Sequence, residues 1–275
     1  MSIRCRIRED IVAGEGRKLL LIAGPDVVET EEQVLTTARE VLRISRKYEL
    51  PAVFKCSFDK ANRTSLHSYR GPGMERALEI FRTVKEETGL PVVTDVHETH
   101  QVERVAEVAD LLQVPAFLSR QTDLLVACAK SGRPVLVKKG QFVAPRDMRH
   151  AVEKLRRSGC EDIILAERGA TFGYNNLVVD MRSLPLMREI GVPVCMDATH
   201  AVQLPSAGDG ASGGERRFVA GLARAAVAMG VDALFLEIHP DPDAALCDGP
   251  NSLDFPLFEQ VVREAVAIRQ ALGQP

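Results

Sequence analysis

The stretch LLLIAGP at residues 19–25, followed by TEEQVLTTAREVLRISRKYE at residues 30–49, decides how the fold is read. The first segment is short and continuously apolar, as expected of a parallel strand that is buried on both faces. In the second, apolar side chains recur at helical spacing from Val34 to Leu42, and Thr30 with the two glutamates after it indicates a helix start. The pair therefore predicts one strand–helix unit.

The same unit recurs along the chain. The later apolar runs are AVFKCS (52–57), PVVTDV (91–96), DLLQVP (110–115), PVLVKKG (134–140), DIILAER (162–168), PVCMDATH (193–200) and ALFLEIHP (233–240). Amphipathic stretches follow them, and many close with Gly or Gly-Xaa-Pro, which commonly ends a helix before a new strand. About eight such units without a long linker predict an α/β fold, a single (β/α)8 TIM barrel at 19–275. Residues 1–18 are then a short N-terminal extension that could cap the bottom of the barrel.

One other fold class, the doubly wound open sheet, fits the chain less well. A doubly wound open sheet typically carries a Gly-rich GxGxxG turn after an early strand, and the sequence has none.

The net charge of −3 gives no electrostatic case for binding nucleic acid or a membrane, and the apolar runs are too short to span a bilayer. The N-terminal residues have no apolar core of a secretory signal. The six cysteines are scattered, without CxxC, so a reducing cytoplasm is the expected location.

Polar and ionisable side chains stand at the end of nearly every predicted strand. In a barrel these ends meet at one mouth, where active sites form. The residues are Asp26, Lys55, Ser57, Asp95, His97, Gln113, Lys138, Lys139, Glu167, Arg168, Asp197, His200, Glu237 and His239. One such residue is normally a solvated strand end, but burying many charges together costs several kcal/mol each unless something binds them. The cations Lys55, Lys138 and Arg168 suit phosphate and carboxylate ligands.

The loop FKCSFDKANRTSLHSYRGPG at 54–73 continues this pattern. It adds Lys60, Asn62, Arg63 and Arg70 immediately after the second predicted strand. Its simplest interpretation is a basic surface loop. Because it leaves the barrel at the mouth, we instead predict a second anion site, and hence two anionic substrates or one with two anionic groups.

Individual positions allow structural readings. Lys139 should point away from Lys138 and be structural, since side chains alternate along a strand. His97 and His239 could be hydrogen-bonded strand-end residues. Asp197 could cap the turn that presents His200. Gln141 and Arg146 could lie on the surface of loops. The Gly-rich segment at 206–217 could be a flexible lid or a passive linker.

Six motifs now make a resemblance visible. KANRTSLHSYRGPG, LLQVPAFLSRQTDLL, VKKGQFVAP, ERGATFGYNN, DATHAVQ and CDGPNSL, in this order across roughly 19–255, closely resemble the 3-deoxy-D-manno-octulosonate 8-phosphate synthase family. The resemblance implies a TIM barrel that condenses phosphoenolpyruvate with arabinose 5-phosphate and water, releasing inorganic phosphate, in lipopolysaccharide precursor biosynthesis. It also implies that the protein is a homotetramer. The other expected binding partners are small phosphorylated substrates. The apolar run Pro115–Leu118, beside Arg120 at the mouth, would be exposed in a lone barrel, which agrees with a covering subunit.

The resemblance also implies roles for particular residues. Lys138 and Arg168 would hold the phosphate of phosphoenolpyruvate, with Lys55, Ser57, Lys60 and Gln113 around its carboxylate and carbon skeleton. Asn62 and Arg63 would receive the sugar phosphate, with Arg120 reaching across from a neighbouring subunit. The catalytic group facing the reacting carbons and sugar hydroxyls would be Asp95, His200, Glu237 and Asp248, together with Lys60.

Three alternative functions are also compatible with the sequence. Relatives that make the seven-carbon 3-deoxy-heptulosonate 7-phosphate from erythrose 4-phosphate typically carry a KPRTS-like segment, and the Asn62 of this chain favours the octulosonate enzyme instead. Lys138 could be the nucleophile of a Schiff-base aldolase. The barrel could also bind phosphosugars without catalysis.

The metal dependence of the family raises a separate question at Asp26. Some members bind a divalent ion through a Cys at this position with residues matching His200, Glu237 and Asp248, whereas metal-free members have Asn. Asp26 is neither, and the four residues would form an oxygen-rich site suited to Mn or Mg. The CDGP segment at 247–250 resembles the metal-free branch, so we expect no metal cofactor. The crowded carboxylates should then raise a carboxylate pKa or keep His200 protonated.

Overall fold

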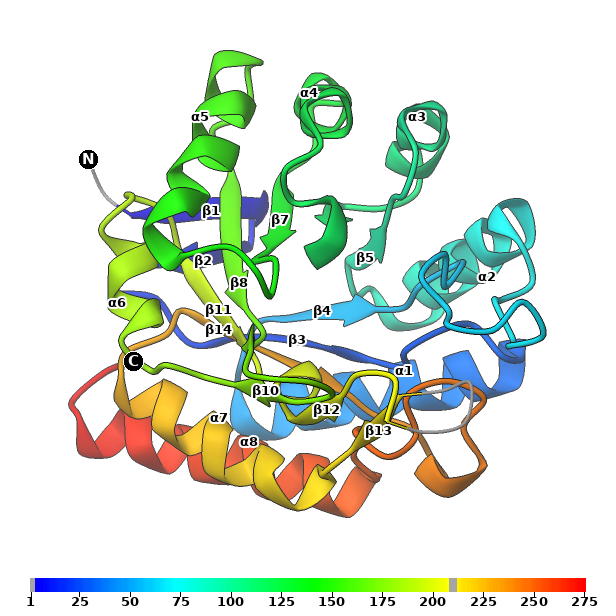
Figure 1. Ribbon diagram of the computed structural model, residues 1–275. Helices are drawn as coiled ribbons and strands as arrows, with labels where there is room; N and C mark the ends of the chain where they lie inside the picture. The colour runs from blue at the N-terminus through cyan, green and yellow to red at the C-terminus, as the bar shows by residue number, and fades with distance from the viewer. Residues whose placement is uncertain (1–2, 208–211) are drawn as a thin grey trace.

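The computed structural model describes residues 3–207 and 212–275, and its centre is a closed parallel β-barrel (Figure 1). Around the barrel the strands follow in chain order, and the last pairs with the first. They are β3 (Leu20–Gly24), β4 (Ala52–Lys55), β5 (Val92–Asp95), β6 (Leu111–Val114), β7 (Val135–Lys138), β8 (Ile163–Glu167), β11 (Val194–Asp197) and β14 (Ala233–Glu237). Each lies in one of the eight predicted apolar runs, so the predicted (β/α)8 barrel is confirmed.

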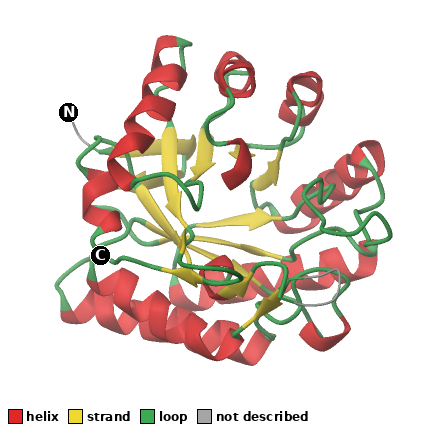
Figure 2. Cartoon of the chain, in the orientation of Figure 1, coloured by secondary structure: helices red, strands yellow, loops and turns green. Residues whose placement is uncertain are grey.

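Helices surround the strands on the outside (Figure 2). They are α1 (Glu31–Tyr48), α2 (Met74–Thr88), α3 (Val102–Ala106), α4 (Thr122–Lys130), α5 (Arg149–Arg157), α6 (Ser183–Arg188), α7 (Val219–Ala228) and α8 (Phe255–Ala271). The predicted start of the first helix is correct, because Thr30 Oγ1 accepts a hydrogen bond from the Gln33 N–H at 3.1 Å. Among the described residues, no helix combines the length and apolar content that a bilayer span requires.

The strand side chains divide between two apolar clusters. Residues such as Ile22, Val53 and Phe235 point into the barrel, whereas Leu21, Phe54 and Leu234 pack against the helices. All eight barrel strands are buried along their whole length, which explains why their sequences are continuously apolar rather than alternating. Polar groups are therefore concentrated where the strands end.

The N-terminal residues form a hairpin that closes one end of the barrel. Strand β1 (Arg4–Arg8) pairs antiparallel with β2 (Ile11–Gly14). Cys5, Ile7, Ile11 and Ala13 are buried in the same apolar cluster as the barrel interior. This cluster fills the N-terminal end of the barrel, and the polar strand ends lie at the opposite end.

Two further strand pairs, which the sequence pattern did not predict, lie outside the barrel sheet. They are β9 (Ala170–Thr171) with β10 (Leu177–Val178), and β12 (Gln203–Leu204) with β13 (Gly213–Gly214). Strand β13 lies within the segment expected to be a lid or a linker, 206–217, and β12 lies just before that segment. Residues 208–211 of the segment lie outside the described residues.

Candidate active site

A cavity of about 350 Å³ lies at the C-terminal mouth of the barrel. Ten of the predicted site residues line it, namely Lys55, Lys60, Asn62, Arg63, Asp95, Gln113, Lys138, Arg168, His200 and Asp248. They come from six different strand ends and from the loops that follow β4 and β14. The rule that strand ends converge at the mouth therefore located the cavity correctly.

One end of the cavity is formed by Lys138 and Arg168. The Lys138 ammonium contacts the Asp197 carboxylate and lies 3.1 Å from the centre of the Phe235 ring. The Arg168 side chain donates from Nη2 to Gln203 Oε1 at 3.0 Å, and within the described chain no carboxylate lies within 4.0 Å of its guanidinium. Burial lowers the pKa of both cations. A buried guanidinium without an anionic partner is a site for an anionic ligand.

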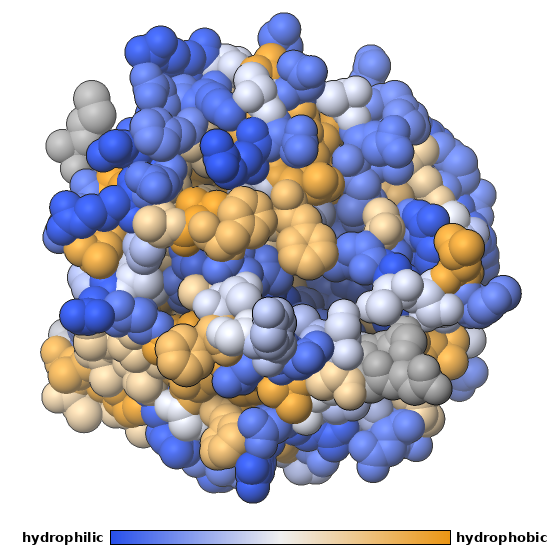
Figure 3. Space-filling view, viewed as in Figure 1, coloured by the Kyte–Doolittle hydropathy of each residue, from blue (hydrophilic) through white to orange (hydrophobic). Residues whose placement is uncertain are grey.

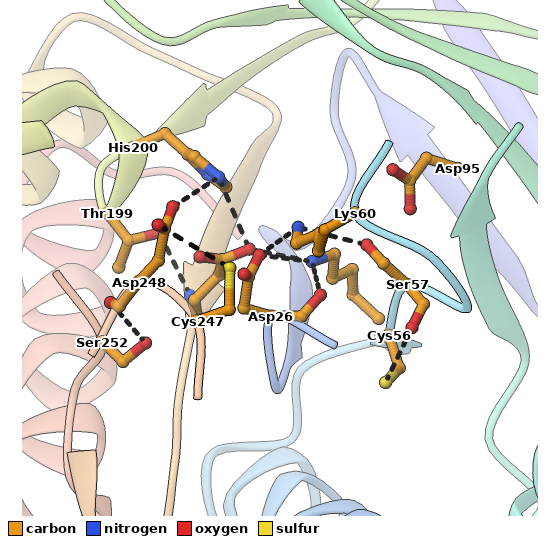
Figure 4. Close-up of polar contacts among 12 residues, drawn as sticks. Asp26, Cys56, Ser57, Lys60, Asp95, Thr199, His200, Cys247, Asp248 and Ser252 are labelled. Carbon is orange, nitrogen blue, oxygen red and sulfur yellow. Dashed lines mark hydrogen bonds and ion pairs between the residues drawn. The ribbon is translucent and has the colours of Figure 1, made fainter. Parts of the chain in front are cut away.

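A second group of charges lies below the cavity, where β3 and β4 approach closely. A Cβ on Gly24 would lie 1.9 Å from the Lys55 carbonyl oxygen, so only glycine fits there. The Lys55 Nζ lies 2.8 Å from both Glu237 Oε1 and the Asp26 carbonyl oxygen. Figure 4 shows Lys60 directed toward Asp26, and the Lys60 ammonium contacts the Asp26 carboxylate. Two lysines thus neutralise two buried carboxylates.

These contacts set the protonation of the carboxyl groups. Burial alone would raise the pKa of Asp26, but Lys60 and Lys55 hold it well below its usual range. Burial, and then the charge on Asp26, raise the pKa of Glu237 to about 7. The same two causes raise the pKa of Asp248. A raised carboxylate pKa is one of the two outcomes that the sequence predicted for this crowded group.

His200 lies among the carboxylates and is held by Asp197. The Nδ1 atom of His200 is 2.8 Å from Asp197 Oδ2, and Nε2 is 3.6 Å from Glu237 Oε1 and 3.8 Å from Asp248 Oδ2. Asp197 Oδ1 accepts hydrogen bonds from the His200 N–H at 2.9 Å and the Thr199 hydroxyl at 3.1 Å. Asp197 therefore caps this turn, as the sequence allowed, and also neutralises Lys138.

The residues proposed for a divalent ion fit such an ion poorly. One ligand atom from each of Asp26, His200, Glu237 and Asp248 lies within 4.8 Å of the others, and three carboxylates with one imidazole would suit Mn or Mg. However, Lys60 contacts the Asp26 carboxylate and Lys55 contacts that of Glu237. A divalent ion at this position would have to displace the two ammonium groups or be repelled by their positive charge. The lysines already supply the positive charge that the carboxylates need.

The loop after β4 supplies the predicted second set of polar groups only in part. Asn62, Arg63 and Thr64 line the cavity, and the Arg63 guanidinium contacts the Cys247 thiol. Arg70 was wrongly expected to join them. It is exposed, does not line the cavity and forms an ion pair with Asp59 instead.

The remaining predicted residues lie in the cavity wall, beneath it or outside it. Ser57 is fully buried, and its hydroxyl accepts from the Lys60 ammonium at 3.3 Å. Arg120 is exposed and does not line the cavity of its own chain. Lys139 is buried 3.3 Å from Glu167, as expected of a structural residue. His97 lines the cavity and lies 3.0 Å from Asp95 Oδ2, while His239 lies 3.4 Å from Glu29.

Sequence reasoning missed two glutamines. Gln141 was expected on the loop surface but lines the cavity, and Gln203 also lines it. Neither directly ends a barrel strand, so the strand-end rule could not find them. Both glutamines lie in motifs that carry the family resemblance, VKKGQFVAP and DATHAVQ, and this was the sequence signal that could have identified them.

The fold and the cavity define a (β/α)8-barrel enzyme with a cation-rich site at its C-terminal mouth. The family model described as DAHP synthetase I family matches residues 2–271. Curated proteins named 2-dehydro-3-deoxyphosphooctonate aldolase are similar over most of their length. The one from Syntrophotalea carbinolica is 56% identical over 94% of each chain, and the one from Desulfotalea psychrophila is 54% identical over 96% of this chain and 95% of its own. The one from Nitratidesulfovibrio vulgaris is 60% identical over 90% and 91%. The chain therefore belongs to the DAHP synthetase I family and, within it, to the 2-dehydro-3-deoxyphosphooctonate aldolases.

Proposed function

We propose that the protein condenses phosphoenolpyruvate with arabinose 5-phosphate and water to give 3-deoxy-D-manno-octulosonate 8-phosphate and inorganic phosphate. The carrying observation is the arrangement of charge in the cavity. Arg168 and Lys138 form one cationic end, Asn62 and Arg63 offer polar groups elsewhere in the wall, and His200 with Asp248 lies among them. This arrangement suits two phosphorylated substrates that react between the two ends.

The chemistry requires groups of this kind. Carbon C3 of phosphoenolpyruvate attacks the sugar aldehyde, so C2 becomes electron-poor and oxocarbenium-like, and the aldehyde oxygen takes up a proton. Water then adds at C2 and loses a proton, and the hemiketal phosphate collapses with cleavage of the C2–O bond. The cations bind the departing phosphate, and the carboxylates stabilise the positive centre. His200, close to Glu237 and Asp248, is placed to transfer protons.

We further propose that turnover needs no metal ion, because lysine ammonium groups contact the Asp26 and Glu237 carboxylates. Dialysis against a chelator, followed by assay in metal-free buffer, is expected to leave the rate unchanged. Loss of activity that Mn or Mg restores would overturn this proposal. Asp26→Asn should also stay active without metal.

The acceptor substrate is tested by phosphate release from phosphoenolpyruvate. We expect arabinose 5-phosphate to support release, and erythrose 4-phosphate to support it far less. Equal or better turnover with erythrose 4-phosphate would assign the seven-carbon reaction instead. Trapping by borohydride would indicate a Schiff base at Lys138, which contacts Asp197 and is buried. Binding of both substrates without phosphate release would indicate a non-catalytic barrel.

The assembly and location are proposals of the same kind. A homotetramer is supported by exposed aromatic side chains around the cavity mouth, including Phe117, which lines the cavity and is 55% exposed. Arg120 would then complete the cavity of a neighbouring subunit. A cytoplasmic location is supported by the six cysteines, all of which are free thiols.

A further inference from the structure

Gln203 links the Arg168 end of the cavity to the group of carboxylates that contains Asp248. Its Oε1 atom accepts a hydrogen bond from Arg168 Nη2 at 3.0 Å, and its Nε2 atom donates one to Asp248 Oδ2 at 2.8 Å. A guanidinium can only donate and a carboxylate only accept, so the residue between them must do both. A side-chain amide of this length meets that requirement.

The backbone of Gln203 is fixed from the other side. Gln203 pairs with Gly214 across β12 and β13, and a Cβ on Gly214 would lie 1.4 Å from Asn251 Oδ1. The strand pair is therefore packed directly against the loop that carries Asp248. Arg216 strengthens this contact, because its Nη2 donates to the Gly249 carbonyl oxygen at 2.7 Å. This packing places the backbone of Gln203 so that its amide lies between Arg168 and Asp248.

Both partners of Gln203 need an external restraint. Arg168 is 5% exposed and has no carboxylate within 4.0 Å among the described residues, so no ion pair orients its guanidinium. Asp248 has a φ of 50°, in the left-handed region where a non-glycine backbone is uncommon. The two hydrogen bonds of Gln203 orient the first and hold the side chain of the second.

We propose that Gln203 is a positioning residue whose amide holds the Arg168 guanidinium and the Asp248 carboxylate in a fixed relation, so that the anion-binding end and the carboxylate–imidazole end of the cavity act on the same substrate. The proposal rests on the proposed function, in which the anion is the phosphate of phosphoenolpyruvate. Gln203 itself need not contact the reacting atoms.

The test is a double-mutant cycle between Gln203→Leu and Arg168→Ala, read by calorimetric titration with phosphoenolpyruvate. In the wild-type background, Gln203→Leu should weaken binding on the order of tenfold, because it removes a hydrogen bond to a charged group. In the Arg168→Ala background the same change should weaken binding less than about twofold, since the group that it orients is gone. The melting temperature should change little in either case.

A matched control comes from Gln141, a second glutamine in the cavity wall. Within the described chain its side chain forms no hydrogen bond to Arg168, so the effects of Gln141→Leu and Arg168→Ala on affinity should multiply. If the losses from Gln203→Leu and Arg168→Ala also multiply, Gln203 does not act through Arg168 and the proposal is wrong. Gln203→Met, close in shape to Gln, replaces the Leu variant if the latter does not fold.

The second hydrogen bond is tested by the corresponding cycle with Asp248→Ala, read as kcat at saturating phosphoenolpyruvate. We expect Gln203→Leu to lower kcat in the wild type but not further in Asp248→Ala, and independent losses would contradict the link. Inorganic phosphate serves as a second ligand in the titrations. Wild-type protein that binds either ligand but releases no phosphate would contradict the proposed function alone. Wild-type protein that binds neither would overturn both proposals.

Discussion

Arg168 illustrates how a side chain that lowers the stability of the fold indicates a binding function. Its guanidinium is buried beside Gln203 without a carboxylate partner among the described residues, and burial lowers its pKa. An unpaired buried cation destabilises a folded chain. A phosphorylated ligand would supply the missing charge and form short, charge-assisted hydrogen bonds.

Replacing Arg168 with Ala should therefore separate binding from stability. We expect kcat/KM for phosphoenolpyruvate to fall by at least about tenfold, from the loss of roughly 1.5–3 kcal/mol of charge-assisted binding. The free energy of unfolding should stay the same or increase. Steady-state kinetics and urea unfolding measure the two quantities. Arg146→Ala, which removes an exposed cation outside the cavity, is the control, and an equal kinetic loss there would contradict the role of Arg168.

Asp197 contributes to the fold as well as to the site. Its side chain is fully buried, contacts Lys138, and accepts hydrogen bonds from Thr199 and His200. Burial alone would raise the pKa of Asp197, but His200 and Lys138 hold it well below its ordinary value. A carboxylate with a lowered pKa stabilises the native state above its unfolded pKa of about 3.9.

Asp197→Asn should accordingly reduce the free energy of unfolding by about 3–5 kcal/mol near neutral pH, because it leaves Lys138 buried without its counter-charge. The difference from wild type should shrink as pH falls below about 4, because the carboxyl of Asp197 then takes up a proton in the unfolded chain while the native carboxylate, with its lowered pKa, stays charged. Urea unfolding at several pH values measures this. Asp180→Asn is the control, since that carboxylate forms an exposed ion pair with Arg182. A difference that grows toward low pH would contradict the account.

At the scale of elements, the sequence predicted the barrel because its eight strands are buried on both faces. It also predicted most of the cavity wall, since Lys55, Asp95, Lys138 and Arg168 stand at or next to the strand ends. It did not predict β9, β10, β12 and β13, which are two-residue strands with no hydrophobic period. Gln203 was missed for the same reason, because the direction of its side chain depends on the pairing of β12 with β13.

The N-terminal hairpin is an element whose effect should be confined to stability. Ile7 is 7% exposed and packs in the apolar cluster inside the barrel, at the end opposite the cavity. Ile7→Ala should lower the free energy of unfolding by about 2–4 kcal/mol and leave kcat unchanged. Chemical unfolding and the phosphate-release assay measure the two effects. Arg4→Ala, on the exposed face of the same strand, is the control. A loss of kcat in folded Ile7→Ala protein would show that the hairpin influences the site.

At the scale of the whole molecule, the exposed aromatic residues require explanation. Phe117, Phe142 and Phe172 are 55%, 62% and 69% exposed. Large apolar side chains rarely cluster on the water-exposed surface of a monomeric protein. Figure 3 shows apolar side chains in a band across the face of the molecule that is turned toward the viewer. The sequence had indicated this surface only through Pro115–Leu118, since the contribution of the later loops depends on how they fold over the mouth.

We expect the wild-type protein to sediment as a tetramer, with these side chains covered by neighbouring subunits. The double variant Phe142→Glu with Phe172→Glu should dissociate, because it places charges in an apolar interface. If Arg120 of a neighbour completes the cavity, dissociation should also raise KM for the sugar phosphate, and Arg120→Ala should reproduce that rise while the protein remains a tetramer. Leu272→Glu, exposed near the end of α8, is the control and should change neither property. Sedimentation velocity and steady-state kinetics decide the matter, and a monomeric wild-type protein with full activity would refute it.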